Sequence, residues 1–235
     1  LYKLDGGRCV LLDTGLLQER EELESTLREA GLTPAGVLCS HAHVDHCANS
    51  GYFQKEYGAK IALTYPEAGM CASLLNLKCY FLTLSPGTVE REASCMIHKP
   101  DLLLPVSDGP FDAWGVRFQI VHTPGHSAGH VCTVTPDNVC YSADALLSSE
   151  MLGAKLPYNL SQQMALASRE KLRHLSCDAY IMAHRGVCSG GEIGALIDAN
   201  QALIRRRAEE ILSFVQEPMT ASQIDEAACI FYKLF

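Results

Sequence analysis

The sequence predicts an α/β protein in which helices cover the faces of β-sheets. In residues 10–64, short apolar strands alternate with helices in the order β-α-β-α-β. Residues 101–142 are instead rich in strands, several with period-two alternation. The chain has 235 residues, 48% of them hydrophobic, so it can form one domain with a proper core.

The first part of the chain gives five regular elements. Val10–Leu12 is a short apolar strand, ended by the turn residues Asp13-Thr14-Gly15. The elements expected after it are a helix over 19–30, a strand ending at Cys39, a helix over 47–57 and a strand over 60–64. Gly31 and Gly58 are placed to end the two helices.

The hydrophobic pattern is less regular between residues 66 and 100 and becomes regular again after residue 100. A helix is expected over 67–77 and irregular backbone over 80–95. Residues 66–100 are therefore interpreted as an insert that either shapes a substrate pocket or is a solvent-exposed connection. The elements expected beyond it are strands over 101–104 and 116–121, a hairpin of 130–135 with 138–142, a helix over 161–175, a strand over 179–183 and a long helix over 192–216. Thr220-Ala221-Ser222-Gln223 is a capping box that starts another helix.

The composition of the chain limits the classes of binding partner and the cellular location that we expect. The net charge of −8 gives no sign of a nucleic-acid surface, although acidity alone does not exclude a nuclease. The scattered cations Lys155, Arg169, Lys171 and Arg173 are interpreted as a solvated face. No apolar run is long enough to cross a bilayer. Eleven cysteines without a C-x-x-C pair favour reduced thiols and a cytoplasmic location. Residues 1–7 resemble the middle of a hairpin, so a preceding strand is expected.

One short motif carries most of the chemical information. His41, His43, Asp45 and His46 lie within six residues, directly after the apolar run 36–39. Side chains alternate along an extended backbone, so the first three can point to one side, and a turn can bring His46 round to them. Imidazole and carboxylate groups bind zinc and similar ions. The motif therefore predicts a metal site.

Three further polar groups follow apolar strands in the same way. His122 comes after the strand expected to end at Val121, Asp144 after the strand ending at Ala143, and His184 after the strand ending at Ala183. Each of these alone is better interpreted as an ordinary polar residue at a strand end. Together with the first motif, they indicate that several strand ends converge on one site.

These motifs resemble those of the metallo-β-lactamase-fold superfamily. The resemblance rests on five segments in the family's order, 13–15, 41–46, 122–126, 142–144 and 183–184, which lie within residues 11–186. It implies a four-layer αββα sandwich of two mixed β-sheets flanked by helices, with the metals at one edge. On this basis residues 1–207 form the catalytic domain. The helical tail 208–235 resembles the start of a small winged-helix-like appendage.

The resemblance also assigns roles to single residues. It implies two sets of metal ligands, His41, His43 and His122 for the first ion, and Asp45, His46 and His184 for the second. Asp144 resembles the carboxylate that bridges the ions, and Asp45 and Asp144 are the candidate catalytic residues. Asp13 resembles an aspartate that supports a ligand, and His126 and Ser127 are expected to be structural or to support a ligand.

The expected function is that of a dinuclear, zinc-dependent hydrolase, with iron or manganese as alternative metals. A hydroxide that bridges two Zn²⁺ ions would attack a small ester, thioester or lactone. The same core would also serve a phosphodiesterase or ribonuclease. A third hypothesis is that the chain is a mononuclear iron oxidoreductase similar to persulfide dioxygenases. The expected partner is a small-molecule substrate, with no membrane. The sequence assigns neither the substrate nor the oligomeric state.

Overall fold

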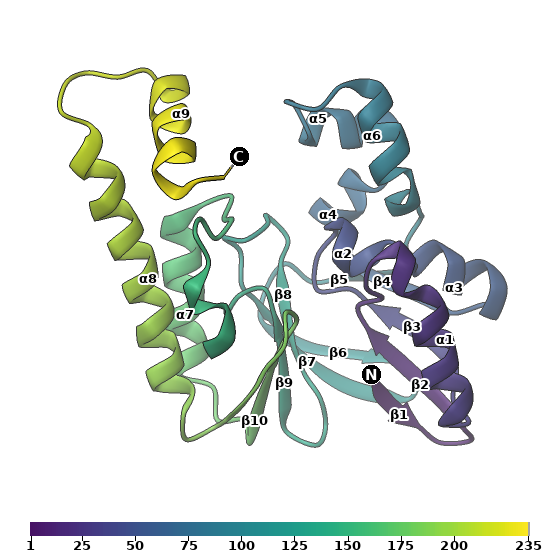
Figure 1. The fold of residues 1–235 in the computed structure, drawn as a ribbon. Coiled ribbons are helices and arrows are strands. Elements are labelled where there is room, and N and C mark those ends of the chain that lie inside the picture. Colours follow the sequence, from purple (N-terminus) through teal and green to yellow (C-terminus); the bar gives the residue numbers. More distant parts are fainter. Residues whose placement is uncertain (235) are drawn as a thin grey trace.

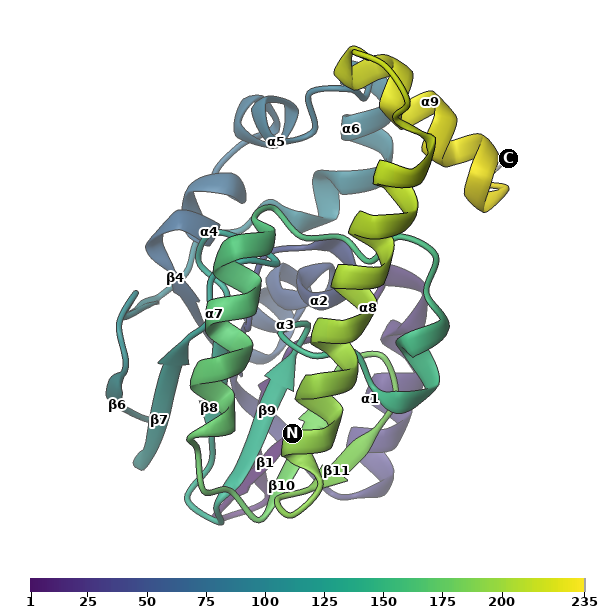
Figure 2. The ribbon, with the colours of Figure 1, turned by 90° about the vertical axis from the view of Figure 1, so that its left-hand side faces the viewer.

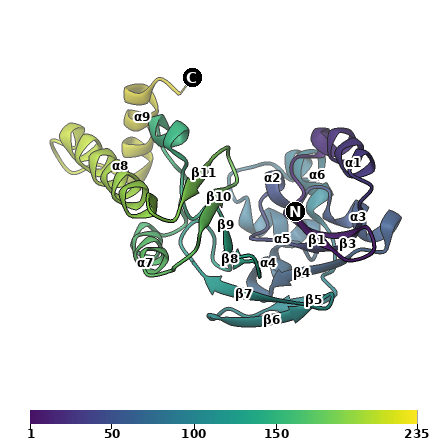
Figure 3. The same cartoon turned by 90° about the horizontal axis from the view of Figure 1, so that it is seen from below.

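The computed structural model describes residues 1–234, which form two β-sheets packed face to face between two layers of helices (Figures 1 and 3). The first sheet has the order β1-β2-β3-β4-β5. Its strands are β1 (Tyr2–Leu4), β2 (Arg8–Leu12), β3 (Thr33–Leu38), β4 (Lys60–Thr64) and β5 (Leu102–Leu104). β1 pairs antiparallel with β2, and the other neighbours are parallel.

The second sheet has the order β11-β10-β9-β8-β7-β6. Its strands are β6 (Gly109–Ala113), β7 (Val116–His122), β8 (Val131–Val134), β9 (Val139–Ala143), β10 (Ala179–Met182) and β11 (Val187–Ser189). Only β9 and β10 are parallel in this sheet. Both sheets are therefore mixed, and the expected four-layer sandwich is confirmed.

The alternation of side chains explains why the first sheet is buried on both faces. Cys9 and Leu11 of β2 pack with the helices on the outer face, whereas Val10 packs between the sheets. There it meets Phe118 and Ile120 of β7. A parallel sheet covered on both faces needs apolar side chains at successive positions, and the sequence of β2 supplies them.

The helices lie in two groups, one outside each sheet. Next to the first sheet are α1 (Arg20–Glu29), α2 (Val44–Cys47), α3 (Ser50–Tyr57), α4 (Tyr65–Met70), α5 (Leu74–Tyr80) and α6 (Pro86–Ala93). Next to the second sheet are α7 (Gln162–Arg173) and α8 (Ile193–Phe214), which Figure 2 shows in front of the strands. α9 (Ala221–Tyr232) follows at the end of the chain.

Two expectations for the insert are wrong. The helix expected over 67–77 is divided into α4 and α5. Ser73 caps the start of α5, and its side chain accepts a hydrogen bond from the Asn76 N–H. Residues 86–93, expected to be irregular, form α6. Ser85 caps it by accepting from the Thr88 N–H, and Pro86 supplies the φ of the first turn. This cap was present in the sequence but was not recognised.

The C-terminal part confirms the two expected helices. The Thr220 side chain accepts from the Gln223 N–H, as the capping box requires. α8 continues without a break through residue 208, where the tail was expected to begin. Within residues 1–234, no helix is both long and apolar enough to span a membrane.

Candidate metal centre

Loops from both sheets bring the polar side chains together at one edge of the sandwich. His41, His43, Asp45 and His46 follow β3, and the loop with His126 follows β7. Asp144 follows β9, which Figure 2 shows running toward α2. His184 follows β10. Because these strands end at the same edge, residues far apart in the sequence come within hydrogen-bonding range of one another.

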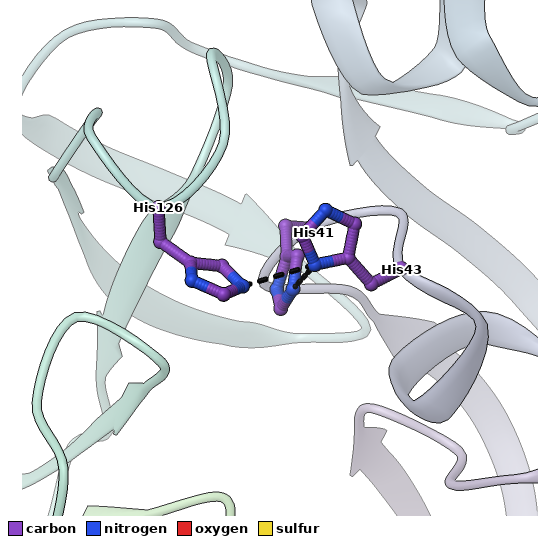
Figure 4. Close-up of side chains that lie close together, drawn as sticks. All are labelled: His41, His43 and His126. Atoms are coloured by element: carbon purple, nitrogen blue, oxygen red, sulfur yellow. Dashed lines mark hydrogen bonds between the residues drawn. The ribbon is translucent and has the colours of Figure 1, made fainter. Parts of the chain in front are cut away.

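A first group of donors consists of three imidazoles, shown in Figure 4. His43 Nδ1 lies 2.9 Å from both His41 Nε2 and His126 Nε2. The opposite nitrogens are held elsewhere: Ser40 Oγ lies 3.0 Å from His41 Nδ1, and the Tyr158 carbonyl lies 3.1 Å from His126 Nδ1.

Those outer contacts decide which ring nitrogens carry protons. Ser40 Oγ donates its hydrogen to Asp13, so it accepts from the His41 Nδ1–H and leaves Nε2 unprotonated. The Tyr158 carbonyl can only accept, so His126 Nδ1 carries the proton and Nε2 is bare. Lone pairs therefore face one another in the group, an arrangement that a cation between them would stabilise.

A second group contains Asp45, His46, Asp144 and His184. Asp144 Oδ2 lies 3.4 Å from His46 Nε2 and 3.3 Å from His184 Nε2. The same oxygen lies 3.3 Å from His126 Nε2, in the first group. Asp45 Oδ2 completes the second group at 3.4 Å from His184 Nε2. Asp144 therefore stands between the two groups.

One predicted ligand does not join the cluster. β7 continues through His122, which pairs with Val131 on β8, and the His122 ring faces the Ala128 carbonyl at 3.5 Å. His126, expected to be structural, takes its place in the first group. The correction has a simple cause: the strand is one residue longer than expected, so only the loop beyond it reaches the cluster.

Asp13 supports the cluster from behind. Its Oδ2 accepts hydrogen bonds from His46 Nδ1 at 2.7 Å, Ser40 Oγ at 2.6 Å and Tyr141 Oη at 2.8 Å. The bond from Nδ1 fixes the His46 ring so that Nε2 points at Asp144 Oδ2, 3.4 Å away. Asp13 thus orients a candidate ligand, as the resemblance implied.

The protonation of the cluster follows from burial and from these carboxylates. Burial lowers the pKa of His43 to about 4 and holds that of His41 well below its usual range. Burial also opposes a charge on His46, but Asp13 and Asp144 outweigh it and raise the His46 pKa. Burial likewise opposes ionisation of Asp144, but the hydrogen bond with His184 and the nearby His46 imidazole hold its pKa far below normal. The three imidazoles of the first group are therefore neutral, and the ionised carboxylate of Asp144 lies in the second group.

A buried glutamate that the sequence did not reveal ties two of the loops together. Glu67 of α4 is 2% exposed, and its Oε2 accepts from the Ala42 N–H at 3.0 Å. Its Oε1 accepts from Ser127 Oγ and from the Gly129 N–H, both at 2.7 Å. Ala42 lies between two candidate ligands and Ser127 follows a third, so this carboxylate fixes the distance between the two loops.

Three residues of the site loops have left-handed backbone, which side chains other than glycine rarely adopt. They are Asp13 with φ 62°, Ala143 with φ 44° and Arg185 with φ 61°. Each lies beside or within a loop that carries a cluster residue. Such strain costs on the order of 1–3 kcal/mol per residue and gathers at functional sites.

A cavity of about 620 Å³ opens beside the cluster. His43, Asp45, His126, Asp144 and His184 lie in its wall. The insert contributes Tyr80, Phe81, Leu82 and Thr83, and the loop before α7 contributes Met151, Ala154, Pro157 and Tyr158. The insert therefore shapes this cavity, one of the two roles expected for it.

The donor set fits divalent metal ions. His46 Nε2 and Asp144 Oδ1 are buried and have no hydrogen-bond partner within residues 1–234. Unpaired buried polar atoms are costly, and a cation at this position would satisfy both. Imidazole nitrogens with a few carboxylate oxygens are the ligands that zinc and similar ions prefer.

Comparison with known proteins places the chain in a family. A sequence model of the metallo-beta-lactamase superfamily matches residues 1–184. The human acyl-coenzyme A thioesterase MBLAC2 is 29% identical over 159 residues, 63% of this chain and 53% of that protein. Hydroxyacylglutathione hydrolase of Xanthomonas campestris is 25% identical over 206 residues, 87% of this chain and 67% of that protein. The chain thus spans about half of the human relative and two thirds of the bacterial one.

Solved structures agree with the sequence comparison. The metallo-beta-lactamase family protein TTHA1429 from Thermus thermophilus superposes with a TM-score of 0.69 and 25% identity. The match covers 95% of this chain and 79% of that one. Because the family model matches residues 1–184, well over half of the sequence, the chain belongs to the metallo-beta-lactamase superfamily, a superfamily of metallo-hydrolases.

Proposed function

We propose that this chain hydrolyses a small ester, thioester or lactone, with two divalent metal ions as its cofactor. The observation that carries the proposal is the pair of donor groups that meet at Asp144. Nitrogen-rich donors with two carboxylates favour zinc as the metal. The relatives named as an acyl-coenzyme A thioesterase and a hydroxyacylglutathione hydrolase support the substrate class.

Each donor group would hold one ion. His41, His43 and His126 would bind the first, Asp45, His46 and His184 would bind the second, and Asp144 would contact both. When bound, two such ions lower the pKa of a shared water toward about 7 and stabilise negative charge on a substrate oxygen.

The protein's own residues would orient the reacting groups. Asp13 and Ser40 keep Nε2 of His46 and of His41 directed at the cluster. The Tyr80 hydroxyl lies 2.8 Å from His43 Nε2 and is placed to accept its proton, which leaves Nδ1 free. Asp45 is partly exposed, and the carboxylate oxygen that does not bind the ion would accept a proton from the attacking water.

The cavity sets the size of the substrate. A volume of about 620 Å³ lies in the range of small-molecule sites, and apolar side chains from the insert and the 151–158 loop form much of its wall. Tyr158 is half exposed, and its hydroxyl lies 3.3 Å from that of Tyr80 at the cavity wall. A small acyl compound therefore fits better than a polymer.

Iron is a second candidate for the metal. The solved protein TTHA1623, 26% identical with a TM-score of 0.57, was crystallised in a di-iron-bound form, and the match covers 80% of this chain. A mixture of nitrogen and oxygen donors also suits iron. Elemental analysis of the purified chain separates zinc from iron.

Metal content and a substrate panel test the proposal. The wild-type chain is expected to hold about two ions and to hydrolyse at least one of the thioesters, esters and lactones in the panel. His126→Ala should lose the first ion and most of the turnover. His122→Ala is the matched control, since its ring lies outside the cluster. Loss of metal in His122→Ala but not in His126→Ala would overturn the assignment, and a loaded chain inactive on the whole panel would refute the hydrolase.

A further inference from the structure

A buried arginine without a counter-ion forms part of the cavity wall. Arg169 of α7 is 2% exposed, although the sequence placed it on a solvated face. Its Nε donates to the Ala145 carbonyl at 3.0 Å. Its Nη1 is buried and has no hydrogen-bond partner, and no ion pair to Arg169 is present within the described 234 residues.

An arrangement of this kind is costly for the folded chain. A buried charge is normally paired, and a guanidinium has five N–H donors of which Arg169 uses one here. Burial lowers the pKa of Arg169 to about 10, so the group remains charged at neutral pH. The buried Nη1 donors of a charged guanidinium therefore lack an acceptor.

The bond to Ala145 does not explain the arginine. That bond holds the loop just after Asp144, but one N–H from a neutral side chain could do the same. The nearby carboxylates face other side chains: Asp144 Oδ2 lies against His46 and His184, and Asp45 lies against His184. Asp144 Oδ1 has no partner, yet no carboxylate forms an ion pair with Arg169 among the residues described.

The remaining wall near Arg169 is mainly apolar. Leu147, Met151 and Pro157 line the same cavity, and they offer hydrocarbon rather than hydrogen bonds. A ligand that matches both the unpaired guanidinium and the apolar wall would carry one anionic group and an apolar part. Arg is also the side chain best shaped to bind planar or tetrahedral oxyanions through two N–H groups.

We propose that Arg169 binds a carboxylate or phosphate group of the substrate next to the Asp144 end of the cavity, with the apolar part of the substrate along Leu147, Met151 and Pro157. The inference rests on the proposed function, because the bound anion is taken to belong to the molecule that is hydrolysed. It narrows the substrate from any small ester to an anionic one.

Calorimetry with three probes tests the site in the full, metal-containing chain. Hexanoate and hexyl phosphate carry the two candidate anions, and hexanamide is a neutral control of similar shape. Arg169→Gln should weaken binding of at least one anion by about 10- to 100-fold and leave hexanamide unchanged. The anion that loses more identifies the group that the substrate carries. Lys155→Gln removes an exposed cation outside the cavity wall and should change nothing.

The inference is wrong if Arg169→Gln binds both anions as the wild type does. It is equally wrong if hexanamide weakens as much as the anions, because Arg169 would then act on the cavity shape alone. Should Arg169→Gln fail to fold, a crystal structure of the wild-type chain with each anion decides. An oxygen of either anion within hydrogen-bonding distance of Arg169 Nη1 supports the site, and anions found only elsewhere refute it.

Binding and turnover are read separately. Anion binding that depends on Arg169 in a chain that hydrolyses nothing would refute the proposed function and leave this site intact. Hydrolysis of neutral and anionic esters at equal rates, with anion binding independent of Arg169, would refute this site and leave the proposed function intact.

Discussion

Glu67 offers the sharpest test of how the cluster is held together. Its carboxylate accepts three hydrogen bonds, from the Ala42 N–H, Ser127 Oγ and the Gly129 N–H, at 2.7–3.0 Å. Glu67→Gln keeps the size of the side chain but replaces one oxygen by an NH₂ group, which cannot accept. Whichever way the amide turns, at least one backbone or hydroxyl donor then faces another donor.

The expected cost follows from this count. Breaking one hydrogen bond to a buried charged acceptor costs about 1.5–3 kcal/mol, and the two remaining bonds weaken because the acceptor becomes neutral. The free energy of unfolding should therefore fall by about 3 kcal/mol. For a chain of this size, that loss corresponds to a decrease in Tm of roughly 6–12 °C. Screening is small, because Glu67 is 2% exposed.

Urea unfolding and chelator competition measure the two consequences. Since Glu67 ties the loop of His41 and His43 to the loop of His126, metal affinity should also fall, by roughly 10- to 100-fold. Glu92→Gln is the matched control: Glu92 is 61% exposed and, among residues 1–234, its carboxylate pairs with Arg91 alone, so its loss should cost under about 0.5 kcal/mol. An unchanged urea midpoint together with unchanged metal affinity in Glu67→Gln would refute the reasoning.

Three further predictions test other parts of the structure. Asp13→Asn should weaken metal binding by roughly 10- to 100-fold, because the charge that orients His46 is lost, and chelator competition that finds the wild-type affinity would contradict this. Gly36→Ala should destabilise the fold by about 1–3 kcal/mol in urea unfolding, since a Cβ there would lie 2.1 Å from the Trp114 indole; a normal midpoint would show that the ring can move aside. Burial holds the pKa of His130 well below its usual value, so near pH 6.5 this histidine binds a proton in the unfolded chain but not in the folded chain. The free energy of unfolding therefore falls as the pH falls, by about 1.4 kcal/mol per pH unit. His130→Gln should remove this part of the pH dependence in unfolding curves recorded between pH 7 and 5. An identical dependence of the unfolding free energy on pH in both proteins would disprove it.

Much of the architecture could be predicted because the local signals agree with the tertiary fold. The strand 60–64 was predicted with the bounds that β4 has, and Gly58 ends α3 in the left-handed conformation. α6 was missed, although Ser85 and Pro86 mark its start. The strands β6 and β11 were also missed. Both are short edge strands that bury few side chains, so only pairing with a neighbour defines them.

The sequence by itself determined six members of the cluster, because polar side chains that follow apolar strands must lie where the strands end. These six are His41, His43, Asp45, His46, Asp144 and His184. The tertiary structure alone decided between His122 and His126, since the end of β7 depends on its pairing with β8 and the path of the loop depends on its contacts. It also decided that the charged side chains of Glu67 and Arg169 are buried. Each lies on a helix whose pattern does not distinguish a solvated charge from one turned inward, and burial of a charge is set by the elements packed against it.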